Sequence, residues 1–134
     1  LVLFTSSSYT RGTRFLVAKE CGVHQNYKNK VLKANDIATM STGKRLGHPV
    51  RSIKNPYTKE YFKLEYSNIS DEELEAYGRG SLYRAAVEGD EKTGCFLAGQ
   101  IAGMVNKEQT AKEIIEEIFT QAEDVLKGAT KWVK

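Results

Sequence analysis

The chain has 134 residues, a formal net charge of +3 at pH 7 and a 40% share of hydrophobic residues. This length suits one modest domain that buries about two-thirds of the surface its unfolded form exposes, and the composition excludes global disorder. No apolar run approaches the ~20 residues of a membrane span, and residues 1–4 lack the basic start of a signal peptide. We therefore expect a cytoplasmic protein with no membrane contact.

The N-terminal residues predict a strand and a turn. Residues 1–4 are apolar and suit a short buried strand, while residues 5–10 are rich in serine and suit a loop. Gly12 and Thr13 predict a turn at the end of a buried strand. Residues 15–18 continue either as the end of that strand or as the first turn of a helix.

The following part of the chain predicts one helix and one strand. Apolar positions recur at helical spacing over 24–34, which predicts a short amphipathic helix. Residues 36–46 are polar and predict irregular structure. Residues 49–54 alternate between apolar and polar types, so a short strand is expected before the break at Asn55-Pro56.

The second half is more helical. We expect helices over 57–66 and from Asp71 to the glycine at 78, then a third over 82–87 that is closed by Gly89. Residues 94–105 are small and apolar, which permits close backbone approach. The last expected helix is the longest, and one of its faces is apolar along residues Ile114, Ile118, Ala122, Val125, Ala129 and Val133.

Two of these helices begin with a capping box. Ser70 with Glu73, and Thr110 with Glu113, have the spacing in which a hydroxyl and a carboxylate satisfy opposite backbone N–H groups of the first turn. The two boxes therefore fix the expected starts of the helices that follow them.

Cysteine and histidine residues point to no metal or nucleophile chemistry. Cys21 and Cys95 lack metal-ligand spacing, so both are expected as free thiols, with a disulfide as the less favoured alternative. His24 precedes a helix and suits a capping role. His48 lies in a glycine-flanked turn and is the better site candidate, although an ordinary loop histidine is the simpler interpretation. No metal ligand and no catalytic residue are predicted.

Charge is unevenly distributed along the chain. Residues 37–59 contain no acidic side chain, whereas residues 65–91 are predominantly acidic. Two interpretations stay open: two solvated faces of opposite sign, or a docking surface for an acidic partner. Nucleic acid is not an expected partner, because no binding motif is present and the basic stretch lacks stacking aromatics before Tyr57.

Two short features have the chemistry of a binding site. Gly12 and Thr13 can offer backbone N–H groups and a hydroxyl to an anion, although a plain structural turn explains them equally. Gln100 is the only polar side chain in residues 96–105. Its amide either bonds to backbone or points into a pocket.

Four islands of sequence, in the same order, closely resemble the C-terminal part of FMN-dependent enoyl-acyl-carrier-protein reductases. These enzymes are grouped with the nitronate monooxygenases in one flavin-barrel superfamily. The similarity runs in register from about residue 12 to residue 134. The islands are GTRFLVAKE at 12–20, NYK at 26–28, GHPVR at 47–51 with IKN at 53–55, and AGQIAG at 98–103.

The resemblance implies a fold class and a division of the chain. The family fold is an α/β TIM barrel with an inserted substrate domain, and this chain corresponds to a mostly helical C-terminal fragment with one or two short strands. Residues 1–20 are then the end of the last barrel strand with its phosphate loop, although 1–11 are atypical. Residues 21–93 are substrate-domain and linking segments, and 94–134 are a pocket segment with a C-terminal helix on the barrel.

The resemblance also implies site residues. Gly12 and Thr13 match the positions that hold the FMN phosphate, and His48 is included in the substrate pocket. His48 does not match the family's catalytic histidine, which is expected upstream, so no catalytic residue is assigned. The flavin and acyl pocket is implied at Leu97, Ala98, Gly99 and Gln100, with Leu97 where the family usually has methionine. From charge alone, and not from the resemblance, we expect the basic residues Arg45, Arg51 and Lys54 to dock acidic acyl carrier protein.

The implied reaction passes electrons from NAD(P)H to FMN and then to the double bond of an enoyl thioester on acyl carrier protein, in fatty acid synthesis. Two alternatives stay open. One is nitronate monooxygenase, and the other is a non-catalytic fragment or binding module when the chain is isolated. A homodimer is compatible with the sequence.

Overall fold

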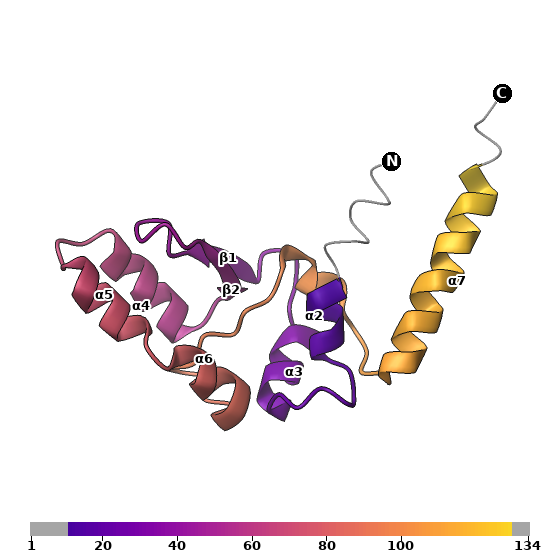
Figure 1. Cartoon of the computed structure of the whole chain (residues 1–134), viewed down its shortest axis with the longest axis horizontal. Coiled ribbons are helices and arrows are strands. Elements are labelled where there is room, and N and C mark those ends of the chain that lie inside the picture. Colours follow the sequence, from indigo (N-terminus) through magenta and orange to yellow (C-terminus); the bar gives the residue numbers. More distant parts are fainter. Residues whose placement is uncertain (1–10, 130–134) are drawn as a thin grey trace.

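The computed structural model describes residues 11–129, so the strand and loop expected over 1–10 lie outside the described part. Most of the described chain is helical, with one two-stranded sheet (Figure 1). The elements in chain order are α2 (Arg11–Leu16), α3 (Gln25–Leu32), β1 (Thr39–Thr42), β2 (Val50–Ile53), α4 (Pro56–Glu65), α5 (Asp71–Gly78), α6 (Ser81–Tyr83), the π-helix η1 (Arg84–Glu88), the 3₁₀-helix η2 (Gln100–Met104) and α7 (Ala111–Ala129).

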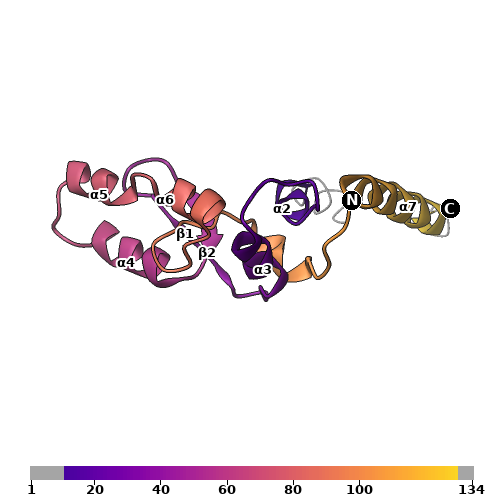
Figure 2. The same ribbon diagram turned by 90° about the horizontal axis from the view of Figure 1, so that it is seen from below.

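These elements form an elongated arrangement. The β1–β2 hairpin lies between α4 and α5 on one side and α2 and α3 on the other, and α7 stands at the far end (Figures 1 and 2). The strands are antiparallel, with Thr39 opposite Ile53 and Thr42 opposite Val50. Residue 97 forms a further antiparallel bridge with Ser52. The pocket segment therefore borders the hairpin.

Local capping explains where several helices begin. Both predicted capping boxes are confirmed: Glu73 N–H donates to Ser70 Oγ at 3.2 Å, and Ser70 N–H donates to Glu73 Oε2 at 2.9 Å. Thr110 and Glu113 make the same reciprocal pair. These helices start where predicted because a capping box needs only residues three apart.

Two expectations about local structure are wrong. Gly12 and Thr13 lie inside helix α2 rather than in a turn after a strand. A strand needs a neighbour for its backbone groups, and within residues 11–129 no strand lies beside this segment. Residues 36–46 are expected to be irregular but contain β1. Pairing with β2 supplies hydrogen-bond partners for the backbone groups of this polar, threonine-bearing stretch.

The main core joins α2, α3, the hairpin and the segment 96–105. Tyr27 and Phe96 pack with ring centroids 5.0 Å apart, and Phe96 is fully buried. The remaining members of the cluster are Val17, Val31, Ile53, Ala85, Ala98, Ala102 and Val105. Residues as far apart in the sequence as Val17 and Val105 thus share one core.

Helix α7 confirms the predicted amphipathic helix as far as Ala129, whereas Val133 lies outside the described residues. Most of the apolar face of α7 is left uncovered by described residues. Ile114 is buried, whereas Phe119 is 67% exposed. The helix is held along its first half, where Ala111 N–H donates to Glu20 Oε2 at 2.8 Å and Glu117 forms an ion pair with Lys107 at 2.9 Å. No helix in the described part is long and apolar enough to cross a membrane.

A tyrosine cluster packs α4 against α5. Tyr57 and Tyr77 stack with centroids 5.4 Å apart, and burial raises the pKa of Tyr57 from 10.0 to about 12. In the unfolded chain this hydroxyl loses its proton near pH 10, whereas in the folded chain it keeps the proton. The contribution of Tyr57 ionisation to the free energy of unfolding is therefore unaffected by pH below about 10. Above that pH the free energy of unfolding falls until the pH reaches about 12.

We expect urea unfolding at a series of pH values to show this alkaline loss of stability. The loss should be shallower in Tyr57→Phe, which cannot ionise at that position. An identical pH dependence in the variant and in the original protein would contradict the assignment to Tyr57.

Candidate functional site

Two segments far apart in sequence meet at one hydrogen bond. The hydroxyl of Thr13, on α2, accepts the backbone N–H of Gly99 at 2.8 Å across 86 positions of the chain. Thr13 is buried, and a Cβ on Gly99 would lie 3.2 Å from the threonine oxygen. The glycine therefore permits this close approach of backbone to hydroxyl.

An open cavity of about 510 Å³ surrounds this contact, and most of its surface is apolar. It contains five of the residues predicted for the cofactor and the pocket, and these are joined by neighbours from α2, α3 and β2. The lining residues are Gly12, Thr13, Leu16, Tyr27, Val50, Arg51, Leu97, Ala98 and Gly99.

The wall of the cavity is fixed by hydrogen bonds from β2 and α3. Ala98 N–H donates to the carbonyl of Arg51 at 3.1 Å, and the hydroxyl of Tyr27 donates to the carbonyl of Leu97 at 2.6 Å. Burial raises the pKa of Tyr27 well above its ordinary value, so the hydroxyl stays protonated and remains a donor. Leu97 is thereby held in one position.

Among the described residues that line this cavity, Arg51 is the charged one. One guanidinium nitrogen, Nη1, donates to the hydroxyl of Thr39 at 3.2 Å. An arginine side chain has five N–H donors, so it can bind an anion while keeping this contact. The cavity thus combines apolar walls with a cation, a hydroxyl and two glycines.

Two predicted pocket residues lie elsewhere. Gln100 begins η2 and is exposed, and it is not among the residues that line the cavity. His48 is exposed in the turn between β1 and β2, where its backbone N–H donates to the carbonyl of Gly43 at 3.0 Å. His48 is therefore an exposed loop residue that does not line the cavity.

The three predicted docking residues do not form one patch. Arg45 forms an ion pair with Asp71 at 2.8 Å and donates to the carbonyls of Ser67 and Ile69, so it attaches the hairpin turn to the start of α5. Arg51 lines the cavity just described, whereas Lys54 lines two other hollows. The acidic and basic stretches of the sequence thus pair partly with each other.

Sequence reasoning missed Tyr27 and the pocket role of Arg51. Both residues lie inside islands of family resemblance, and this was the available signal, but no local pattern indicated that α3 and β2 would converge on residues 97–99. Among residues 11–129, no group of three or more histidine, cysteine or acidic side chains could hold a metal ion. Cys21 and Cys95 are both free thiols.

Comparison with known proteins gives the class and the family of this chain. The fold and the cavity define an α/β chain whose candidate site lies between a short helix and a sheet edge. Residues 6–121 match the family model described as nitronate monooxygenase, and the chain belongs to this family.

Solved structures agree with this assignment. The chain is similar to FabK from Thermotoga maritima, with 36% identity, a TM-score of 0.86, and coverage of 91% of this chain and 39% of FabK. A methionine-to-alanine mutant of the same FabK matches with 33% identity and a TM-score of 0.76, over 91% of this chain and 36% of the mutant.

The suspected family and the fold class are therefore confirmed, and the chain spans about 39% of the length of FabK. The division into domains at residues 20 and 93 stays a prediction.

Proposed function

We propose that this chain forms the cofactor-phosphate contact and part of the acyl pocket of a flavin-dependent enoyl-acyl-carrier-protein reductase. The observation that carries the proposal is the hydrogen bond from Gly99 N–H to Thr13 Oγ1. It joins the segment implied to hold FMN phosphate to the segment implied to line the pocket. The similarity to FabK supports the choice of reaction.

The residues of the cavity fit part of an FMN molecule. Gly12 is exposed, with nothing within 4 Å of the position a Cβ would occupy, so its backbone is accessible to a phosphate. Thr13 accepts from Gly99 and still has its own O–H to donate. Arg51 offers positive charge, and the apolar wall suits a flavin ring.

These side chains bind and orient; none is assigned a catalytic role. When bound, FMN supplies hydride transfer between NAD(P)H and the double bond of the substrate. Leu97 and Ala98 shape the apolar wall and exclude water, while Tyr27 holds the carbonyl of Leu97 in place.

The contribution of Thr13 is testable with a matched pair of variants. Thr13→Val keeps the shape but removes both the acceptor for Gly99 and the hydroxyl donor, whereas Thr13→Ser retains them. We expect FMN affinity to fall by about tenfold or more in the valine variant, as loss of about 1.5 kcal/mol of hydrogen bonding implies. The serine variant should remain within about threefold of the original.

Flavin titration by fluorescence quenching, on the longest form of the protein that its coding sequence specifies, measures these affinities. Equal affinities in the valine and serine variants would show that the Thr13 hydroxyl does not support the cofactor.

The reaction itself is distinguished from the family alternative by two assays. A reductase oxidises NADH or NADPH in the presence of a crotonyl thioester, whereas a nitronate monooxygenase consumes oxygen with a nitronate. The family model's description keeps the second reaction as the alternative. Oxygen uptake with nitronate and no oxidation with the thioester would reverse the proposal.

The third alternative is that the isolated 134-residue chain is non-catalytic. It is supported by the coverage of FabK, because the chain corresponds to 39% of that structure. Stoichiometric quenching of FMN by the purified 134-residue chain would contradict it.

A further inference from the structure

A second concave surface lies beside α3 and the end of β2. Two adjacent hollows, of about 430 and 710 Å³, share the lining residues Lys30, Lys54 and Glu91. We call this surface the lysine groove. Its charged residues are Lys30, Lys33, Lys54, Lys59, Lys63, Lys92, Glu60 and Glu91.

The groove concentrates the positive charge of the protein. Its six lysines against two glutamates leave a formal excess of four charges, more than the +3 of the entire chain. Lys33, Lys54, Lys59 and Lys92 form no ion pair with another residue of the described part. Clustered like charges repel one another, so an anionic partner would be attracted to this surface.

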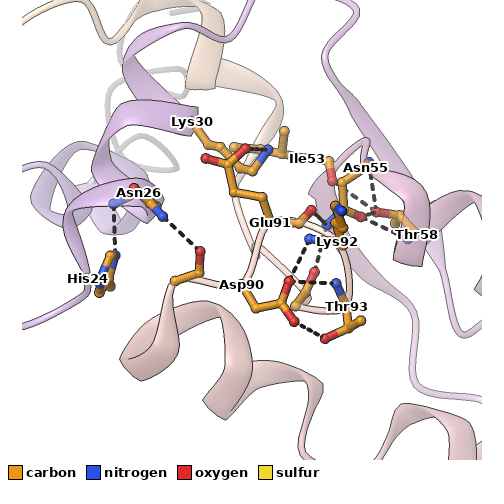
Figure 3. A network of polar contacts seen from close by, with 12 residues as sticks. His24, Asn26, Lys30, Ile53, Asn55, Thr58, Asp90, Glu91, Lys92 and Thr93 are labelled. Atoms are coloured by element: carbon orange, nitrogen blue, oxygen red, sulfur yellow. Dashed lines mark hydrogen bonds and ion pairs between the residues drawn. The ribbon is translucent and has the colours of Figure 1, made fainter.

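The groove has a pre-formed wall at residues 89–94. Lys30 forms an ion pair with Glu91 at 3.0 Å, and its ammonium lies 5.3 Å from the centre of the Phe96 ring. Asn55 Nδ2 donates to the carbonyls of Glu91 and Gly94 at 3.1 and 2.7 Å. Figure 3 shows Lys30 and Glu91 reaching toward each other above this network. A surface held in this way loses little freedom on binding.

The lining indicates a protein rather than a small phosphate compound. Ile37, which is 74% exposed, and Pro56 place apolar surface among the lysines. None of the described residues that line the groove is an arginine, so the lining lacks the planar fork that gives bidentate phosphate recognition. Dispersed ammonium groups around apolar residues match a protein surface that carries several carboxylates.

The position of the groove connects it to the candidate pocket. Helix α3 contributes Tyr27 to the pocket and Lys30 to the groove, and β2 leads from Arg51 at the pocket to Lys54 just beyond its end. Three residues of extended chain span about 10 Å. A protein docked in the groove would therefore lie close to the pocket.

We propose that the lysine groove is the docking surface for the acidic protein that presents the substrate. Resting on the proposed function, that partner is acyl carrier protein. This surface differs from the patch expected from sequence, because Lys54 belongs to it whereas Arg45 is engaged with α5.

The test compares two double variants with the same change in net charge. Lys54→Glu with Lys59→Glu reverses two unpaired charges in the groove, while Lys19→Glu with Lys44→Glu reverses two exposed lysines outside it. The probe is fluorescently labelled acyl carrier protein without an acyl group, measured by anisotropy at low ionic strength. We expect its Kd to rise by at least about tenfold in the groove variant and by less than about threefold in the control.

A kinetic arm separates docking from chemistry. The KM for crotonyl-acyl-carrier-protein should rise in the groove variant, while the KM for crotonyl-pantetheine, which lacks the carrier, should not change. Lys54→Gln with Lys59→Gln repeats the comparison with a milder change if the glutamate variant does not fold.

The outcomes are distinct. Equal carrier binding by the groove and control variants overturns the docking proposal, even if crotonyl-pantetheine is reduced. Binding of inorganic pyrophosphate to the groove without binding of the carrier also overturns it. Failure of the longest form of the protein that its coding sequence specifies to reduce crotonyl-pantetheine overturns the proposed function instead, and the anisotropy measurement still decides whether the groove docks the carrier.

Discussion

Replacement of Glu65 by glutamine is expected to lower the free energy of unfolding by about 2–4 kcal/mol. Glu65 is 3% exposed, and its carboxylate accepts the backbone N–H groups of Gly43 at 3.2 Å and Arg45 at 2.9 Å. The amide of glutamine keeps one acceptor oxygen but turns a donor toward one of these N–H groups. One buried backbone donor of the hairpin turn then loses its partner.

Urea unfolding of Glu65→Gln measures this cost, and Glu60→Gln is the matched control. Glu60 lies on the same helix but is exposed, and its ion pair with a residue of the described part is with Lys63, at 3.2 Å. Its replacement should change stability by less than about 1 kcal/mol, as is usual for a surface pair. Equal effects of the two substitutions would show that Glu65 does not hold the turn.

Gly94→Ala is expected to destabilise the fold by about 3 kcal/mol, because the added methyl group has no space. A Cβ at this position would lie 2.6 Å from the carbonyl oxygen of Asp90 and 2.8 Å from the backbone of Ala85. These are backbone atoms, so a rotamer change cannot relieve the contact. The carbonyl of Gly94 also accepts from Asn55 at 2.7 Å, so a shift would loosen the wall of the lysine groove.

The measurement is again equilibrium unfolding, with Gly22→Ala as the control because nothing lies within 4 Å of its added Cβ. We expect the control to remain within about 0.5 kcal/mol of the original protein. A Gly94→Ala protein as stable as the control would mean that residues 85 and 90 move apart at little cost.

The two substitutions affect two segments that support the candidate pocket and the lysine groove. Glu65 fixes the turn of the hairpin whose second strand borders the candidate pocket, and Gly94 permits the tight loop that borders the groove. Neither Glu65 nor Gly94 lines the pocket or the groove, so each can affect binding only through the structure around it. Their effects should therefore be measured as stability before any change in binding is interpreted.

Local sequence determined the starts of α5 and α7 and the long helical run of α7. The capping boxes at Ser70 and Thr110 were predictable because each involves residues three positions apart, and the amphipathic period of α7 needs only its own residues. The strand at 50–53 was also predictable from alternation. The family resemblance identified the residues on both sides of the pocket.

Tertiary structure decided everything that depends on which segments meet. Helix α2 replaced the expected turn, and β1 formed in a polar stretch because β2 pairs with it. The contact between Thr13 and Gly99 spans 86 positions, so no local pattern could reveal it. In the same way, Arg45, Arg51 and Lys54 are close in sequence but are directed to three different surroundings. Sequence by itself specified the elements and the family, because these follow from short-range chemistry; the pocket and the groove arise only from packing between distant segments.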